Sequence, residues 1–230
     1  MHRSSLALAI LGAWCLALLA ARITLSGTVT YVFLAWNLFL AFIPLAAATL
    51  LARLQERRRS GLAQAALAAV WLVFLPNAPY LTTDFVHLRA RAPVPLWYDI
   101  ALLCTFAVTG LVVGYVSVLC VQRVIATRHG DTMGWLCAAS ALALSGFGIY
   151  LGRFQRRNSW ELLTNPLDVA MEIALRIANP FSYPRTLGVT AVYGGCLVVG
   201  YIVFRALSSD LSVSRGAAPH ASSRASAVRN

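Results

Sequence analysis

Charged residues are scarce in this 230-residue chain, and lysine is absent altogether. Only 12% of the residues are charged, whereas 59% are hydrophobic and the mean hydropathy is +0.71. A soluble domain has about 25% charged residues and roughly half or fewer apolar ones. The composition therefore excludes an ordinary soluble protein and indicates a protein of the lipid bilayer.

The chain also lacks the motifs of common metal and hydrolase chemistry. Its five cysteines form no CxxC pair, and each falls within an apolar run: Cys15, Cys104, Cys120, Cys137 and Cys196. An odd number of cysteines, all within apolar runs, argues against a disulfide framework. The absence of a CxxC pair argues against a cysteine zinc site. HExxH, GxSxG and Walker sequences are missing too. We expect no metal site, and the sequence identifies no cofactor.

The chain contains instead six apolar runs of about 20 residues, the length that crosses ~30 Å of hydrocarbon. They cover 5–21, 29–52, 62–81, 100–121, 133–151 and 187–207. The sequence therefore predicts an all-α, polytopic transmembrane helix bundle over residues 1–207. Residues 208–230 are rich in serine, alanine and arginine without apolar periodicity, so we expect a disordered tail there.

The net charge of +11 comes entirely from arginine on the basic side. In a soluble protein this excess would suggest nucleic acid. Here the arginines flank apolar runs, so we expect the lipid bilayer and anionic lipid as partners, and no nucleic acid. More arginines lie on the side of both termini than on the opposite side. The positive-inside rule then predicts a multi-pass protein of the cytoplasmic membrane with both termini in the cytoplasm.

A short segment before the last apolar run reads LDVAMEIALRIA, residues 167–178. Its charged residues Asp168, Glu172 and Arg176 recur every four positions, which places them on one face of a helix. The segment is too short to span a bilayer, so we expect an interfacial amphipathic helix. An ordinary amphipathic helix with a solvated face is the alternative.

Small residues recur at helical spacing in two of the apolar runs. Gly110 and Gly114 form one GxxxG motif, and Gly148 and Gly152 form another. Glycines four residues apart allow helices to approach closely in lipid. We interpret both motifs as packing within the bundle rather than as a dimer face.

The third apolar run ends in an unusual way, with the sequence WLVFLPNAPYLTTDFVHL. Pro76 and Pro79 are three residues apart, so a regular helix cannot continue through them. Non-helical backbone at membrane depth is tolerated only inside protein or beside water. Asp84 and His87 follow the break directly, which makes this region the best candidate for a site.

Two polar clusters are predicted at the same membrane face, because two spans separate them. The first comprises Asn77, Tyr80, Asp84 and His87, followed by Asp99; the second comprises Arg153, Arg156, Arg157, Asn158, Trp160 and Glu161. Ionisable groups near hydrocarbon are costly unless they are paired. We therefore expect Asp84, His87 and Asp99 to pair with Arg153 and with Arg156 or Arg157.

These residue types allow several kinds of chemistry. The two aspartates could act as acid and base, with His87 as a proton carrier. The arginines suit a phosphate or carboxylate, such as a lipid head group. The alternative is an ion-pair network that only fastens two loops to the bundle.

Three strings carry a resemblance to a known family: FLPNAPYLTTDFVHL, WYD at 97–99, and YLGRFQRRNSWELLTNP. They resemble the bacterial membrane-protein family called domain of unknown function 1361, over roughly the second to the sixth span. The resemblance implies a multi-pass protein of the bacterial inner membrane without an established activity, and it supplies no catalytic residues. The family usually has aspartate where this chain has Glu161.

The sequence leaves three functions open. The preferred interpretation is an integral membrane protein with a polar, loop-built site at one face, either structural or ligand-binding. The alternative is a membrane-embedded enzyme that acts on a lipid-linked or phosphate-bearing substrate. A small transporter is the third, although a second interrupted span is missing and Pro44 is the nearest candidate.

Overall fold

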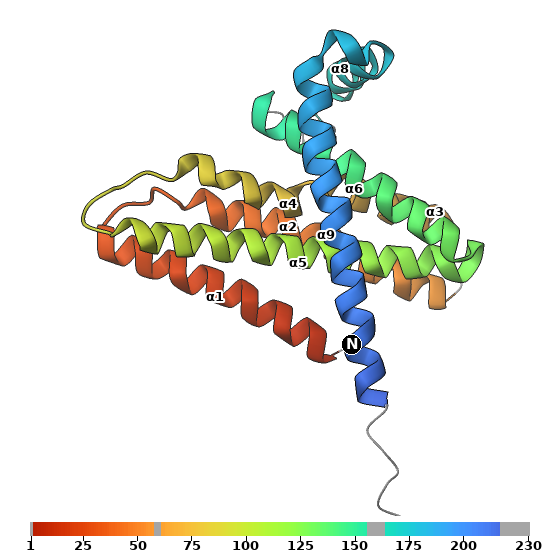
Figure 1. Ribbon diagram of the computed structural model, residues 1–230, viewed down its shortest axis with the longest axis horizontal. Coiled ribbons are helices and arrows are strands. Elements are labelled where there is room, and N and C mark those ends of the chain that lie inside the picture. Colours follow the sequence, from red (N-terminus) through yellow and green to blue (C-terminus); the bar gives the residue numbers. More distant parts are fainter. Residues whose placement is uncertain (1, 58–60, 156–163, 217–230) are drawn as a thin grey trace, which may run out of the picture.

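The structure is a computed structural model that describes residues 2–57, 61–155 and 164–216. Helices account for nearly all of this described part, which contains no strand (Figure 1). Six helices are long and apolar enough to cross a membrane: Ser5–Ser26, Phe33–Glu56, Gly61–His87, Leu96–His129, Asp131–Phe154 and Pro184–Ser209. Each corresponds to one predicted run, so the prediction of an all-α, multi-pass membrane protein is confirmed.

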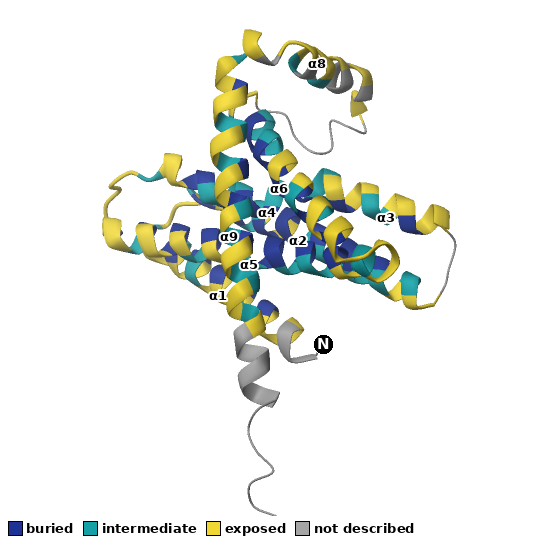
Figure 2. Cartoon of the chain, turned by 45° about the vertical axis from the view of Figure 1, so that its right-hand side comes forward, coloured by how far each residue is buried: buried dark blue, intermediate teal, exposed yellow. Residues whose placement is uncertain are grey.

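The long helices form a bundle around α5 (Leu96–His129). Helices α1 (His2–Ser26) and α2 (Phe33–Glu56) pack on one part of α5, and α6 (Asp131–Phe154) packs on another. Helix α9 (Pro184–Gly216) packs mainly on α6 and runs across the other helices in both views (Figures 1 and 2). Buried residues gather where these helices meet, whereas large apolar side chains remain exposed along the outside, as lipid contact requires (Figure 2).

The third span breaks at the two prolines, as predicted. Helix α3 (Gly61–Phe74) ends before Pro76, the single turn α4 (Asn77–Tyr80) follows, and the 3-10 helix η1 (Leu81–His87) completes the span. Side chains bind several of the carbonyl groups around the break. The amide of Asn77 donates to the Phe74 carbonyl oxygen at 3.0 Å.

Two threonine hydroxyls continue this pattern beyond the break. Thr82 donates to the carbonyl oxygen of Pro79 and Thr83 to that of Tyr80, each at 2.7 Å. A carbonyl without a donor is costly in hydrocarbon, so these short polar side chains make the irregular backbone tolerable.

Glycines on two neighbouring helices make room for the broken segment. A Cβ atom placed on Gly110 of α5 would collide with the Ala78 carbonyl oxygen. A Cβ on Gly148 of α6 would lie 2.6 Å from Cβ of Pro76. The predicted GxxxG motifs therefore serve packing within the bundle, because their glycines lie against the Pro76–Pro79 break.

The last part of the chain contains a separate amphipathic helix. Helix α8 (Pro166–Ala178) covers the predicted segment, with Leu167, Met171 and Leu175 exposed along one line. Figure 1 shows α8 beside the start of α9 and away from the main bundle. After the 3-10 turn η2 (Pro180–Ser182), α9 continues to Gly216, past the predicted boundary at 207, and residues 217–230 lie outside the described residues.

We predict that Gly110→Ala destabilises the protein, because the new methyl group would displace the Ala78 carbonyl. Overpacking of this kind costs about 1–3 kcal/mol. Thermal unfolding of the purified protein in detergent measures the effect.

Gly195→Ala is the matched control, because a Cβ at this exposed position of α9 has no atom within 4 Å. In a helix, alanine is about 0.5–1 kcal/mol more favourable than glycine, so this variant should melt at or above the wild-type temperature. Equal melting temperatures for the two variants would contradict the role given to Gly110.

Candidate functional site

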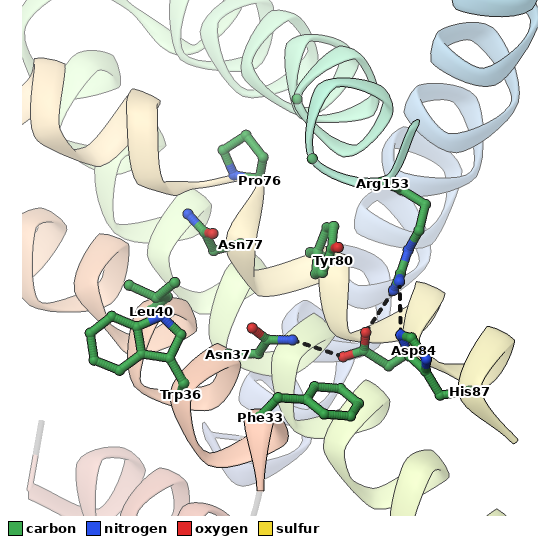
Figure 3. A pocket seen from close by; sticks show the side chains of 12 residues that line it. Phe33, Trp36, Asn37, Leu40, Pro76, Asn77, Tyr80, Asp84, His87 and Arg153 are labelled. Atoms are coloured by element: carbon green, nitrogen blue, oxygen red, sulfur yellow. Dashed lines mark hydrogen bonds and ion pairs between the residues drawn. The ribbon is translucent and has the colours of Figure 1, made fainter. Parts of the chain in front are cut away.

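The candidate site forms where η1 meets the end of α6. The Arg153 Nη2 atom of α6 lies 2.6 Å from the Asp84 Oδ1 atom of η1, forming an ion pair (Figure 3). The same guanidinium donates from Nε and Nη2 to the Thr83 hydroxyl, at 3.0 and 2.6 Å. The two polar clusters predicted to share a membrane face therefore meet through Arg153 and Asp84.

Asp84 is almost wholly enclosed, with 1% of its side chain exposed. Its second carboxylate oxygen, Oδ2, accepts a hydrogen bond from the amide of Asn37 on α2 at 3.1 Å (Figure 3). Both oxygens of this buried acid are thus engaged, as a buried carboxylate requires. Asp84 joins three elements: η1, α2 and α6.

His87 lies on the open side of this pair. Its Nε2 atom is 3.2 Å from Nη1 of Arg153 (Figure 3). A guanidinium only donates hydrogen bonds, so Nε2 must be the acceptor and the ring proton is assigned to Nδ1. The ring also meets the Phe33 ring edge-on, with 5.0 Å between centroids. In this geometry His87 is a neutral imidazole.

A cleft of about 240 Å³ lies beside the ion pair. It is lined by Phe33, Trp36, Asn37 and Leu40 of α2, by Pro76, Asn77, Tyr80, Asp84 and His87 of the broken span, and by Gly148, Gly152 and Arg153 of α6 (Figure 3). The guanidinium of Arg153 lies over the Tyr80 ring, 4.7 Å from its centroid. One end of the cleft is polar, and the wall formed by Trp36, Leu40 and Pro76 is apolar.

Asp99 takes a different partner from the one expected. Its two carboxylate oxygens accept hydrogen bonds from Nε and Nη2 of Arg22 on α1, at 3.0 and 3.3 Å. Both side chains are buried, at 0% and 1% exposure. The expected pairing of Asp99 with Arg153 is therefore wrong: Asp99 does not line the cleft, and its ion pair joins α1 to α5.

Tyr31, between α1 and α2, connects the Arg22–Asp99 ion pair to the backbone of η1. Its ring lies 5.3 Å from the Arg22 guanidinium carbon, and its hydroxyl donates to the His87 carbonyl oxygen at 3.3 Å. Burial above all, and then the nearby Asp99 carboxylate, raises the pKa of the Tyr31 phenol. The hydroxyl therefore stays protonated and remains a donor.

Sequence reasoning missed several residues of this region, namely Arg22, Tyr31, Asn37 and Thr83. Arg22 carried a usable signal, because it ends the first apolar run on the same face as Asp99. Asn37 carried a weaker one, as a lone amide inside an otherwise apolar run.

The other members of the second predicted cluster, Arg156, Arg157, Asn158, Trp160 and Glu161, lie outside the described residues. Within the described ranges, no three His, Cys, Asp or Glu side chains gather in a way that could hold a metal ion.

Comparison with known proteins gives one family. The model of the family described as "Protein of unknown function (DUF1361)" matches residues 36–199. The chain belongs to this family. The match includes every cleft residue of this DUF1361 protein except Phe33, whereas α1, and with it Arg22, lies outside the matched range. No curated protein and no solved structure matches the chain.

We predict that Asp99→Asn is strongly destabilising, because it leaves the Arg22 cation buried without a counter-charge. Breaking one side of a buried pair costs about 3–5 kcal/mol. The double variant Arg22→Met with Asp99→Leu should regain much of this loss, because no charge remains buried.

Thermal unfolding in detergent compares these variants, with Asp131→Asn at an exposed position of α6 as the control. The control should change stability by less than about 0.5 kcal/mol. An Asp99→Asn variant as stable as the control would show that this ion pair does not hold α1.

Proposed function

We propose that this DUF1361 protein is a ligand-binding protein of the bacterial cytoplasmic membrane. Its cleft would bind an amphipathic molecule with an anionic, phosphate-bearing head group. Both termini would lie in the cytoplasm, which the arginine distribution favours, and the cleft would then open at the extracytoplasmic face. The observation that carries the proposal is Arg153, an arginine held at the mouth of a cleft with donor capacity to spare.

The hydrogen bonds of Arg153 show this capacity. A guanidinium has five N–H donors. Four of them have acceptors: Nε and one N–H of Nη2 donate to Thr83, the other N–H of Nη2 donates to Asp84, and one N–H of Nη1 donates to His87. The fifth, on Nη1, has no partner among the described residues, and 17% of the Arg153 side chain is exposed. An anionic oxygen in the cleft would supply the missing acceptor.

The charge around the cleft supports an anion rather than a cation. Asp84 is enclosed and both of its oxygens are engaged, so a ligand would meet the guanidinium and not the carboxylate. Arg89 and Arg91 are exposed on the same membrane face. Together they would attract phosphate-bearing lipids toward the cleft.

The apolar wall supports a ligand that comes from the bilayer. Trp36 of α2 is 52% exposed on the outer side of the bundle, although it also lines the cleft. Leu40 and Pro76 continue this wall inward. A chain of carbon atoms could rest there while the head group reaches Arg153, which is the usual division of a lipid-binding site into apolar and polar parts.

The geometry supports binding better than catalysis or transport. Asp84 and His87 both accept hydrogen bonds from Arg153, so neither is available as a general base in this arrangement. Among the described spans only the third is interrupted, and α2 continues as a helix through Pro44. A transporter built from symmetric repeats would need a second broken span.

Helix α8 fits the same orientation. We place it at the membrane interface on the face of the cleft, with Leu167, Met171 and Leu175 turned toward the acyl chains. Their exposure along one line of the helix supports this placement.

Farnesyl phosphate and farnesol test the proposal, because the two probes differ only in the phosphate. We predict that farnesyl phosphate raises the unfolding temperature of the wild-type protein in detergent more than farnesol does. Loss of one charge-assisted hydrogen bond should weaken binding of farnesyl phosphate about tenfold in Arg153→Gln.

Two further variants separate binding from folding. Arg185→Gln removes the same charge from the same face outside the cleft and should bind farnesyl phosphate like the wild type. Gly152→Val keeps the Arg153–Asp84 ion pair but adds bulk to the cleft, and it should weaken binding of both probes. Equal stabilisation of the wild type by farnesol and farnesyl phosphate would refute the proposal. So would an equal loss of affinity for farnesyl phosphate in Arg153→Gln and Arg185→Gln.

A further inference from the structure

A second concave surface lies between α6 and α9, toward the membrane face opposite the cleft. It is a groove of about 250 Å³, lined by Thr132, Trp135, Leu136, Ala139 and Leu142 of α6 and by Val198, Tyr201 and Ile202 of α9. The lining is almost wholly apolar. Leu136 and Ile202 are both about half exposed, so the groove opens to the outside of the bundle.

The packing of the two helices explains why a groove forms there. In its first third, α9 touches α6 backbone to backbone: a Cβ atom on Gly146 would lie 2.6 Å from the backbone nitrogen of Gly194. Farther along, the large side chains of Trp135 and Tyr201 stand between the helices, with 5.8 Å between ring centroids. Crossing helices that touch at small residues must separate on either side of the contact.

Arg205 of α9 lies one helical turn beyond Tyr201; it contacts the groove residue Trp135 but does not itself line the groove. Its guanidinium carbon lies 5.6 Å from the centroid of the Trp135 ring. Its Nε atom is buried and has no hydrogen-bond partner, and Arg205 forms no ion pair with any residue that the structure describes. A cation that is stacked on an aromatic ring of an apolar groove, without a counter-charge among the described residues, is suited to an anionic oxygen.

We propose that this groove binds an anionic phospholipid, with an acyl chain along α6 and α9 and its phosphate on Arg205. Trp135 would then lie at the level of the head groups, where tryptophan is common in membrane proteins. The hydroxyl of Thr132, exposed in the first turn of α6, offers a second hydrogen-bond donor at the same end. This site is separate from the cleft around Arg153 in both its residues and its membrane face.

The charge of the chain favours a lipid over a second copy of the protein as the occupant. The chain carries a net charge of +11, with only eight acidic residues, and none of the residues that line the groove is acidic. A second copy would bring arginines toward Arg205 more readily than carboxylates. An anionic phospholipid supplies both parts that the groove lacks, an apolar chain and a negative oxygen.

Native mass spectrometry of the full-length protein in detergent tests the proposal, with dioleoyl phosphatidylglycerol and dioleoyl phosphatidylcholine as probes. We expect the wild type to retain phosphatidylglycerol at lower lipid concentration than phosphatidylcholine. Arg205→Gln should weaken the tightest phosphatidylglycerol binding step about tenfold, the effect of one charge-assisted hydrogen bond. Arg128→Gln, an exposed arginine at the end of α5 on the same membrane face, should leave this step unchanged.

Ala139→Phe keeps Arg205 but fills the groove, so it should weaken retention of both lipids, and it keeps the test decisive if Arg205→Gln does not fold. An equal loss of phosphatidylglycerol affinity in Arg205→Gln and Arg128→Gln would overturn the proposal, because the general positive charge of the surface would then explain binding. A dimer in the wild type that Ala139→Phe converts to a monomer would overturn it in favour of a second copy.

Discussion

Backbone polar groups that leave a regular helix inside a membrane must find partners, and this constraint organises the bundle. Pro76 and Pro79 interrupt the third span, and nearby side chains bind the carbonyl groups around the break. Gly110 and Gly148 let α5 and α6 close over it. The break therefore lies inside protein, and it turns η1 so that Asp84 faces both α2 and α6.

The two ion pairs show how the same chemistry has different consequences in different surroundings. Arg22 and Asp99 are both enclosed, make a two-point contact and do not line the cleft, so their contribution is to fasten α1 to α5. Arg153 keeps part of its surface beside a cleft, and one of its N–H donors has no partner within the part of the chain that the structure describes. Under the proposed function, burial and residual hydrogen-bonding capacity distinguish the ion pair that fastens two helices from the one that would bind a ligand.

Much of the fold could be predicted because membrane spans have a length and a polarity that single sequences display. The six spans, the break at Pro76 and the shared face of Asp84 and Arg153 all follow from apolar runs, proline chemistry and the parity of crossings. The partner of Asp99 could not be predicted in this way. The number of membrane crossings assigns a residue to a membrane face, but it does not say which neighbouring helix a side chain meets. The contacts of Arg22 and Asn37 therefore needed the packed structure.

The composition of the cleft has a consequence for how the protein is made. Among the described residues, its lining comes from α2, from the broken third span and from α6, and not from α9. Helix α9 attaches mainly to α6 from outside. These lining residues have therefore all been synthesised by the time the ribosome reaches Arg153, while the last span is still to come. The described part of the cleft thus belongs to the part of the chain that is synthesised first, and α9 is added later, with Leu197 and Tyr201 completing the core of the bundle.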